Sequence, residues 1–188
     1  MNALRMMLLA TGLWISTIEI CTANGSAAQI VIDWNERAYE SAFAEDQFQT
    51  FKGQRAHAMM HLAQHDALNG VDRRFDRYLT AKRRSSLLEP YADASAAAAQ
   101  AAHDVLLSQY PNDRQAIRAL LAQQLASIPE GPDKQAGQDL GRRSAASILA
   151  VRTGDGIDRK GAYAFSGDVG AYQTSPGWKG FVAWPAFG

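Results

Sequence analysis

Apolar residues recur at spacings of three and four along most of this 188-residue chain, and this period predicts amphipathic helices. Residues 55–71 are apolar enough to be buried and carry three of the four histidines, and we expect them to form the central helix of the fold. At 3.6 residues per turn, one strip of this helix carries three histidines four apart, which are His57, His61 and His65. We expect the helix to end at Asn69-Gly70, because glycine adopts the left-handed conformation that terminates helices.

A further helix is expected before the central one. Asp33 can accept hydrogen bonds from the backbone amides of a helix that begins at Trp34 or Asn35 and runs to about Asp46. We expect Trp34 to anchor this helix in the core. After the central helix, residues 72–92 contain six basic residues interleaved with aromatics. A solvated loop is favoured there over a site for phosphates or single-stranded nucleic acid.

Three more helices are expected in the second half of the chain. Residues 93–110 are rich in alanine and contain no helix-breaking residue. Asn112 or Asp113 then caps an amphipathic helix, and a last helix runs from Pro132 to about residue 153. This last helix has small residues four apart, which suit close packing: Gly137, Gly141 and Ala145. The pattern predicts an all-α fold, a helical bundle of about five helices.

Residues 1–28 have the pattern of an export signal. Arg5 supplies the positive start, a mostly apolar run extends to Ile20, and small residues at 26–28 form a cleavage site. The alternative is an uncleaved membrane anchor, but the run is shorter than the roughly 20 residues that span a bilayer, so we expect no stable membrane span. Cys21, the only cysteine, lies inside this leader. The sequence therefore predicts a periplasmic or secreted protein that needs no disulfide.

The remaining chain divides into a helical domain, residues 29–160, and an irregular tail, residues 161–188. The tail is dense in glycine and aromatic residues and has no helical period. Its aromatic side chains would bury a large area if another surface covered them. We therefore expect a missing carboxy-terminal half, or a second copy of the chain, to pack on the tail. The formal net charge of zero gives no electrostatic attraction to nucleic acid, which we do not expect as a partner.

The histidine strip suggests a metal site, because imidazoles four apart on a helix can point at one ion. However, Leu62 stands where a zinc hydrolase would place its catalytic glutamate. We therefore favour a structural or solvent-facing role for these histidines. The weak metal-ligand candidates are His61, His65, Asp66, His103 and Asp104.

Four of these candidates form two histidine-aspartate doublets, a residue pair found in metal-dependent phosphohydrolases. Adjacent helix positions point about 100° apart, so each doublet would need further ligands to hold one ion. We favour buried hydrogen bonds for the doublets. The expected cationic partners of the two aspartates are Arg55, Arg142 or Arg143.

Other catalytic machinery is not evident. The expected mature chain has no cysteine, no glycine-serine-glycine elbow and no phosphate-binding loop. Residues 154–156, Gly-Asp-Gly, and residues 167–170, Gly-Asp-Val-Gly, have the composition of turns and too few acids for calcium loops. We expect no catalytic and no cofactor-binding residue among these segments.

Several short segments of the sequence together resemble those of a known protein family. They are DWN at residue 33, MMHLAQHDALNGVD from Met59, AAHDVLLSQYP from Ala101, IPEG from Ile128, LGRRSAASILAVRTGDG from Leu140, and SPGWKG followed by FVAWPAFG. In these phrases the chain resembles the amino-terminal half of bacterial vanadium-dependent haloperoxidases. That largely helical family belongs to the superfamily of type-two phosphatidic acid phosphatases and bacterial acid phosphatases.

The resemblance implies that the catalytic site lies in the other half of the family's fold. There, vanadate or phosphate is held by a lysine and arginine-proline stretch, a proline-serine-glycine-histidine stretch and a serine-arginine stretch followed by a histidine, none of which occurs here. We therefore expect a helical domain that is inactive alone, with vanadate bound only in the full-length family. The alternatives are an exported module that docks a partner through its aromatic tail, and a metal-dependent hydrolase that uses the histidine-aspartate pairs.

Overall fold

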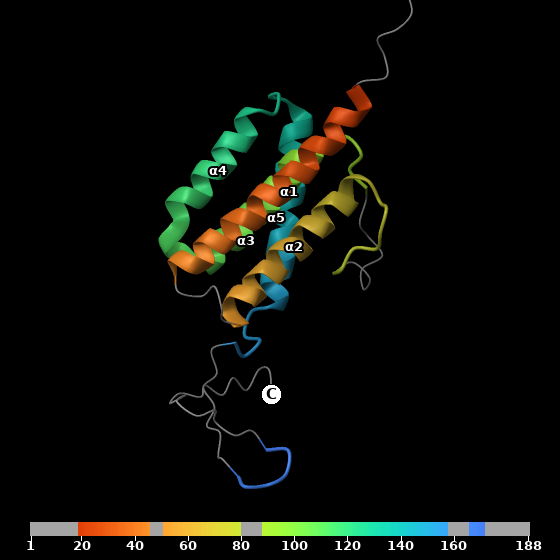
Figure 1. Cartoon of the computed structure of the whole chain (residues 1–188). Helices are drawn as coiled ribbons and strands as arrows, with labels where there is room; N and C mark the ends of the chain where they lie inside the picture. Colours follow the sequence, from red (N-terminus) through yellow and green to blue (C-terminus); the bar gives the residue numbers. More distant parts are fainter. Residues whose placement is uncertain (1–18, 46–50, 80–87, 158–165, 172–188) are drawn as a thin grey trace, which may run out of the picture.

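The protein is an all-α bundle in the computed structural model, which describes residues 19–45, 51–79, 88–157 and 166–171 (Figure 1). Within these ranges there are five α-helices and no strand, so the predicted fold class is confirmed. The helices are α1 Glu19–Ala44, α2 Phe51–Val71, α3 Ala94–Gln109, α4 Arg114–Ala126 and α5 Pro132–Val151. A short 3-10 turn, η2 Pro111–Asp113, joins α3 to α4.

The hub of the bundle is α3. Figure 1 shows α1 and α2 in front of α3 and α5, with α4 along one flank, and α3 contacts each of the other four helices. Nearly all of residues 95–106 are buried, because alanine leaves room for a neighbour on every side of the helix. The prediction that residues 55–71 form the centre was therefore wrong: α2 is a neighbour of the alanine-rich helix.

Glycines allow α5 to lie directly on the backbone of α3. A Cβ atom on Gly141 would lie 2.5 Å from the carbonyl oxygen of Ala97 and 2.9 Å from the amide nitrogen of Ala101. A Cβ atom on Gly137 would collide with the carbonyl oxygen of Asp93. The prediction that small residues four apart on this helix permit close packing is confirmed.

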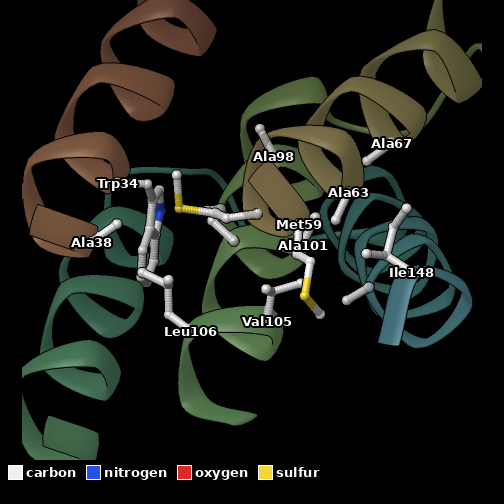
Figure 2. Close-up of a cluster of buried hydrophobic side chains, with 14 of the residues drawn as sticks. Trp34, Ala38, Met59, Ala63, Ala67, Ala98, Ala101, Val105, Leu106 and Ile148 are labelled. Atoms are coloured by element: carbon white, nitrogen blue, oxygen red, sulfur yellow. The ribbon is translucent and has the colours of Figure 1, made fainter. Parts of the chain in front are cut away.

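Trp34 anchors α1 in the core, as expected, but through polar contacts as well as apolar ones. The side chain is fully buried, and its indole nitrogen donates a hydrogen bond of 2.7 Å to Gln124 Oε1 on α4. The amide nitrogen of Gln124 in turn donates to Asp33 Oδ2 at 3.1 Å. Figure 2 shows the buried apolar cluster that includes Trp34, and the residues it labels are Trp34, Ala38, Met59, Ala63, Ala67, Ala98, Ala101, Val105, Leu106 and Ile148.

The start of α1 differs from the prediction. The helix begins at Glu19, so Asp33 lies inside it and accepts hydrogen bonds from side-chain amides instead of capping the helix. The physical reason is that the buried stripe of α1 starts one turn before Trp34, at Ile30, and continues at intervals of four residues to Ala38 and Ala42. Such a stripe requires helix upstream of Trp34.

The structure has a side-chain cap on α3 that was not predicted, and it lacks the one predicted for α4. Asp93 caps α3, because its carboxylate accepts the amide of Ala96 at 2.7 Å. Asp113 makes no capping hydrogen bond to α4; its carboxylate instead accepts from the Ser41 hydroxyl at 2.5 Å and pairs with Arg37 at 3.2 Å. This aspartate therefore ties η2 to α1.

The end of α2 also differs. The helix continues to Val71, and Gly70 lies inside it without a positive φ. A Cβ atom on Gly70 would lie 2.9 Å from Leu140 Cδ1, so this glycine makes room for a side chain of α5 and does not terminate the helix.

Two predicted segments fall largely outside the described residues. They are the leader up to residue 18 and most of the tail from residue 161 onward. The helix α1 continues through residues 26–28, the expected cleavage site. Within the described ranges, no helix combines the length and the apolar character needed to cross a bilayer.

Candidate functional site

The three histidines of α2 bond to three different parts of the molecule. His57 Nδ1 donates to the carbonyl oxygen of Gly53 at 2.9 Å, and His61 Nε2 lies 3.0 Å from Asn35 Oδ1 of α1. His65 Nε2 donates to the carbonyl oxygen of Asp76 at 3.0 Å. The histidines therefore tie α2 to itself, to α1 and to the following loop, and they do not converge on one point.

His61 is held in its neutral form. Burial lowers the pKa of its imidazole below 6.5, and the neighbouring charge of His57 lowers it further, while a hydrogen bond with Gln64 acts in the opposite direction. A neutral imidazole suits the amide contact with Asn35. This histidine therefore has a structural partner at neutral pH.

Asp66 is satisfied by backbone amides. Its two carboxylate oxygens accept from the amides of Tyr78 and Leu79, at 2.5 and 3.1 Å. Asn69 acts one turn later in the same way, with its side-chain oxygen accepting from the amides of Arg74 and Phe75 at 3.2 and 2.8 Å. These two side chains fold residues 72–79 back along α2.

The second doublet forms a contact within α3. His103 Nδ1 lies 2.7 Å from Asp104 Oδ1, which also accepts from the amide of Gln100 at 2.8 Å. Gln138 of α5 donates to Gln100 at 3.2 Å, so the cluster joins the two helices. The rings of Trp34 and His103 form a T-shaped pair, with centroids 6.4 Å apart.

The expected arginine partners of the two aspartates were wrong. Arg55, Arg142 and Arg143 pair instead with Asp155, Asp139 and Glu89. The physical reason is that other groups satisfy both carboxylates. The backbone amides of Tyr78 and Leu79 donate to Asp66, and side chains of α3 contact Asp104. No three His, Cys, Asp or Glu side chains in the described part of the chain are placed to hold a metal ion. Of the five weak metal-ligand candidates, only His103 and Asp104 contact each other, and the other three bond to different partners.

Arg55 builds a feature that the sequence did not reveal. Its Nε donates to Asp155 at 2.8 Å, Nη1 to the side chain of Gln109 at 2.9 Å, and Nη2 to the carbonyl oxygen of Arg152 at 3.0 Å. Burial alone would raise the pKa of Asp155, but hydrogen bonds from Arg55 and the amide of Ile157, with the nearby positive charges, lower it below its usual value. We call these contacts the Arg55 clamp; they join α2, α3 and the end of α5.

A cavity of about 910 Å³ lies beside the Arg55 clamp. We call it the basin, and its described lining residues are Lys52, Arg55, Met59, Ser108, Gln109, Leu149, Arg152, Thr153, Gly154, Asp155, Gly156 and Ile157. The turn at its rim needs glycine, since Gly154 and Gly156 have φ of 69° and 88°. The Gly-Asp-Gly composition signalled this turn, but the partner of its aspartate is 100 residues away in sequence.

Comparisons with known proteins add no family to this geometry. No protein-family model, curated protein or solved structure matches the chain.

Proposed function

We propose that this chain is a non-catalytic helical domain of a protein related to the vanadium-dependent haloperoxidases and acid phosphatases. Its role is to support an oxyanion-binding site formed elsewhere in the parent protein, which would oxidise halide with hydrogen peroxide or hydrolyse phosphoesters. The proposal draws on the sequence resemblance and on the all-α bundle.

The observation that carries the proposal is that all four histidines form hydrogen bonds to structural partners. Catalysis at a bound oxyanion requires clustered cations and an acid-base histidine in one cleft. His57, His61 and His65 are bonded to three separate structural partners, and His103 is bonded to Asp104. The basin contains cations, but no histidine is among its described lining residues. These groups suit a scaffold better than a reaction centre.

The proposal is tested by activity. The purified chain is incubated with vanadate, bromide and hydrogen peroxide, and bromination of an indicator dye is followed. We expect no rate above that of vanadate without protein. Saturable turnover, absent from a heat-denatured sample, would refute the non-catalytic assignment.

The family part has a separate test. If the resemblance reflects descent, the gene should encode the three anion-binding stretches downstream of the codon for Gly188. A reading frame that stops there, with no such stretches in a neighbouring frame, removes the haloperoxidase assignment and leaves the helical scaffold.

A second candidate is an exported interaction module that pairs with another copy of itself. It is favoured by the exposed apolar face of α1, where Ile32, Tyr39 and Phe43 are 56, 48 and 76% exposed. Light scattering of the parent and of Phe43→Ser separates the outcomes. Association that the substitution weakens supports the module, whereas a monomer at every concentration rules out self-pairing.

A further inference from the structure

We propose that the chain forms a two-fold dimer in which the exposed apolar face of α1 in each copy packs on α4 of the other copy. We call this surface the α1 face, and its large apolar side chains are Ile32, Tyr39 and Phe43. The inference rests on the second candidate function, self-pairing, and it names the partner surface that this candidate leaves open.

The α1 face is one continuous stripe. Ile32, Tyr39 and Phe43 follow one another at seven and four residues, so they lie within about 40° of one another around the helix. They are 56, 48 and 76% exposed, whereas Trp34 on the opposite side of α1 is fully buried. The ring of Tyr39 also contacts His57 of α2, which holds it in position on the stripe. Large apolar side chains grouped on one exposed face are typical of a surface that another protein covers.

The charges around the α1 face are mostly acidic. From residue 29 to the end of α1, the charged residues are Asp33, Glu36 and Glu40 against Arg37. Arg37 pairs with Glu40 and with Asp113, so it does not offset the charge of Glu36. Glu36 is exposed in the middle of the stripe, and its side chain forms no hydrogen bond or ion pair within the described residues. A protein surface that covers the α1 face should therefore carry positive charge.

The outer face of α4 supplies that charge. This helix has no acidic residue and two arginines, Arg114 and Arg118, which are both exposed. Arg114 donates to the carbonyl oxygen of Pro111, whereas the side chain of Arg118 has no such bond in the part of the chain that the structure describes. The exposed side of α4 also carries three alanines, which leave room for larger side chains: Ala119, Ala122 and Ala126. The face is therefore complementary to the α1 face in charge and in side-chain size.

The positions of α1 and α4 suit a two-fold arrangement. Figure 1 shows the two helices side by side, and Trp34 of α1 donates to Gln124 of α4. A two-fold axis between them brings α1 of each copy onto α4 of the other, so each contact is made twice. Glu36 lies near the middle of the α1 face and Arg118 near the middle of α4, so these side chains can meet whichever way the paired helices run.

Sedimentation velocity of the full chain over a range of concentrations measures the dissociation constant of the dimer. We expect Glu36→Arg and Arg118→Glu each to raise this constant about tenfold, because a reversed charge acts at both copies of the contact. The double variant, Glu36→Arg with Arg118→Glu, restores opposite charges and should return the constant to within about threefold of the parent. Arg142→Glu is the matched control: it reverses an exposed arginine of α5 outside both faces and should leave the constant unchanged.

The outcomes separate the α4 contact from self-pairing in general. Association that Phe43→Ser weakens, but that the double variant does not restore, overturns the α4 contact and leaves self-pairing standing. An equal loss in Arg142→Glu and Arg118→Glu would be a general effect of charge and also overturns the contact. A parent that is monomeric at every concentration overturns both. Because Glu36 and Arg118 are exposed, circular dichroism should show the helix content of the parent in each variant.

Discussion

Replacing Gly141 by alanine should separate two helices that the fold holds in backbone contact. The added Cβ atom would lie 2.5 Å from the carbonyl oxygen of Ala97, 2.8 Å from Gln100 Cβ and 2.9 Å from the amide nitrogen of Ala101. Two of these atoms belong to the backbone of α3 and cannot rotate away. Relief therefore requires α5 to move off α3, the helix that contacts all the others.

Two effects of opposite sign set the magnitude. Alanine in place of glycine inside a helix stabilises it by about 1 kcal/mol. Overpacking a close interface costs about 1–3 kcal/mol and sometimes more, and three contacts below 3 Å place Gly141→Ala at the upper end. We expect a net loss of about 2 kcal/mol, which corresponds to about 4–8 °C in melting temperature for a chain of this length.

Gly70→Ala is the matched control. Its Cβ atom would also meet a neighbour at 2.9 Å, but that neighbour is Leu140 Cδ1, the end of a flexible side chain. We expect its melting temperature to stay within about 2 °C of the parent, because the gain in helix propensity offsets a small repacking cost. Thermal unfolding followed by circular dichroism compares the three proteins. A Gly141→Ala protein that melts with or above Gly70→Ala would refute the backbone-contact argument.

Three single substitutions test other contacts. Trp34→Phe leaves a buried amide oxygen of Gln124 unpaired, so urea titration should show a free energy of unfolding lower by about 1–3 kcal/mol. Asp155→Asn should lower the thermal midpoint at pH 7; because folding lowers the pKa of Asp155, the difference from the parent should shrink below pH 3.8, and a constant difference contradicts this. Folding also lowers the pKa of His61, so protonation favours the unfolded chain, and His61→Gln should flatten the fall in thermal midpoint below pH 6.5; equal slopes contradict this.

The sequence predicted local features of the fold well. Helical periodicity and helix breakers predicted five helices and the start of the last one at Pro132. Gly137 and Gly141 signalled close packing because small residues at helical spacing act through the shape of one face. Each of these features depends on residues within a few positions of one another.

Features that depend on distant residues were not predictable in the same way. The Arg55 clamp joins a guanidinium to a carboxylate 100 residues later, and no local pattern marks that pair. The burial of Asp66 correctly indicated that it needs partners, but backbone amides carry no sequence signature, so arginines were the only partners that composition could suggest. The same limit explains why the prediction placed α2, and not α3, at the centre of the fold. The four helices that pack on the alanine-rich α3 come from distant parts of the sequence, so no local pattern marks its central position.

Buried polar contacts determine how the helices of this alanine-rich bundle are aligned along one another. Alanine faces let helices approach closely, but their smooth surfaces do little to fix how far one helix slides along another. The buried polar contacts supply that register, because a displacement of one turn would leave polar groups unpaired in the core. Trp34, Gln124 and Asp33 fix α1 against α4, and Gln100 with Gln138 fixes α3 against α5. These side chains therefore define one alignment of the helices, which is the property that the proposed supporting role requires.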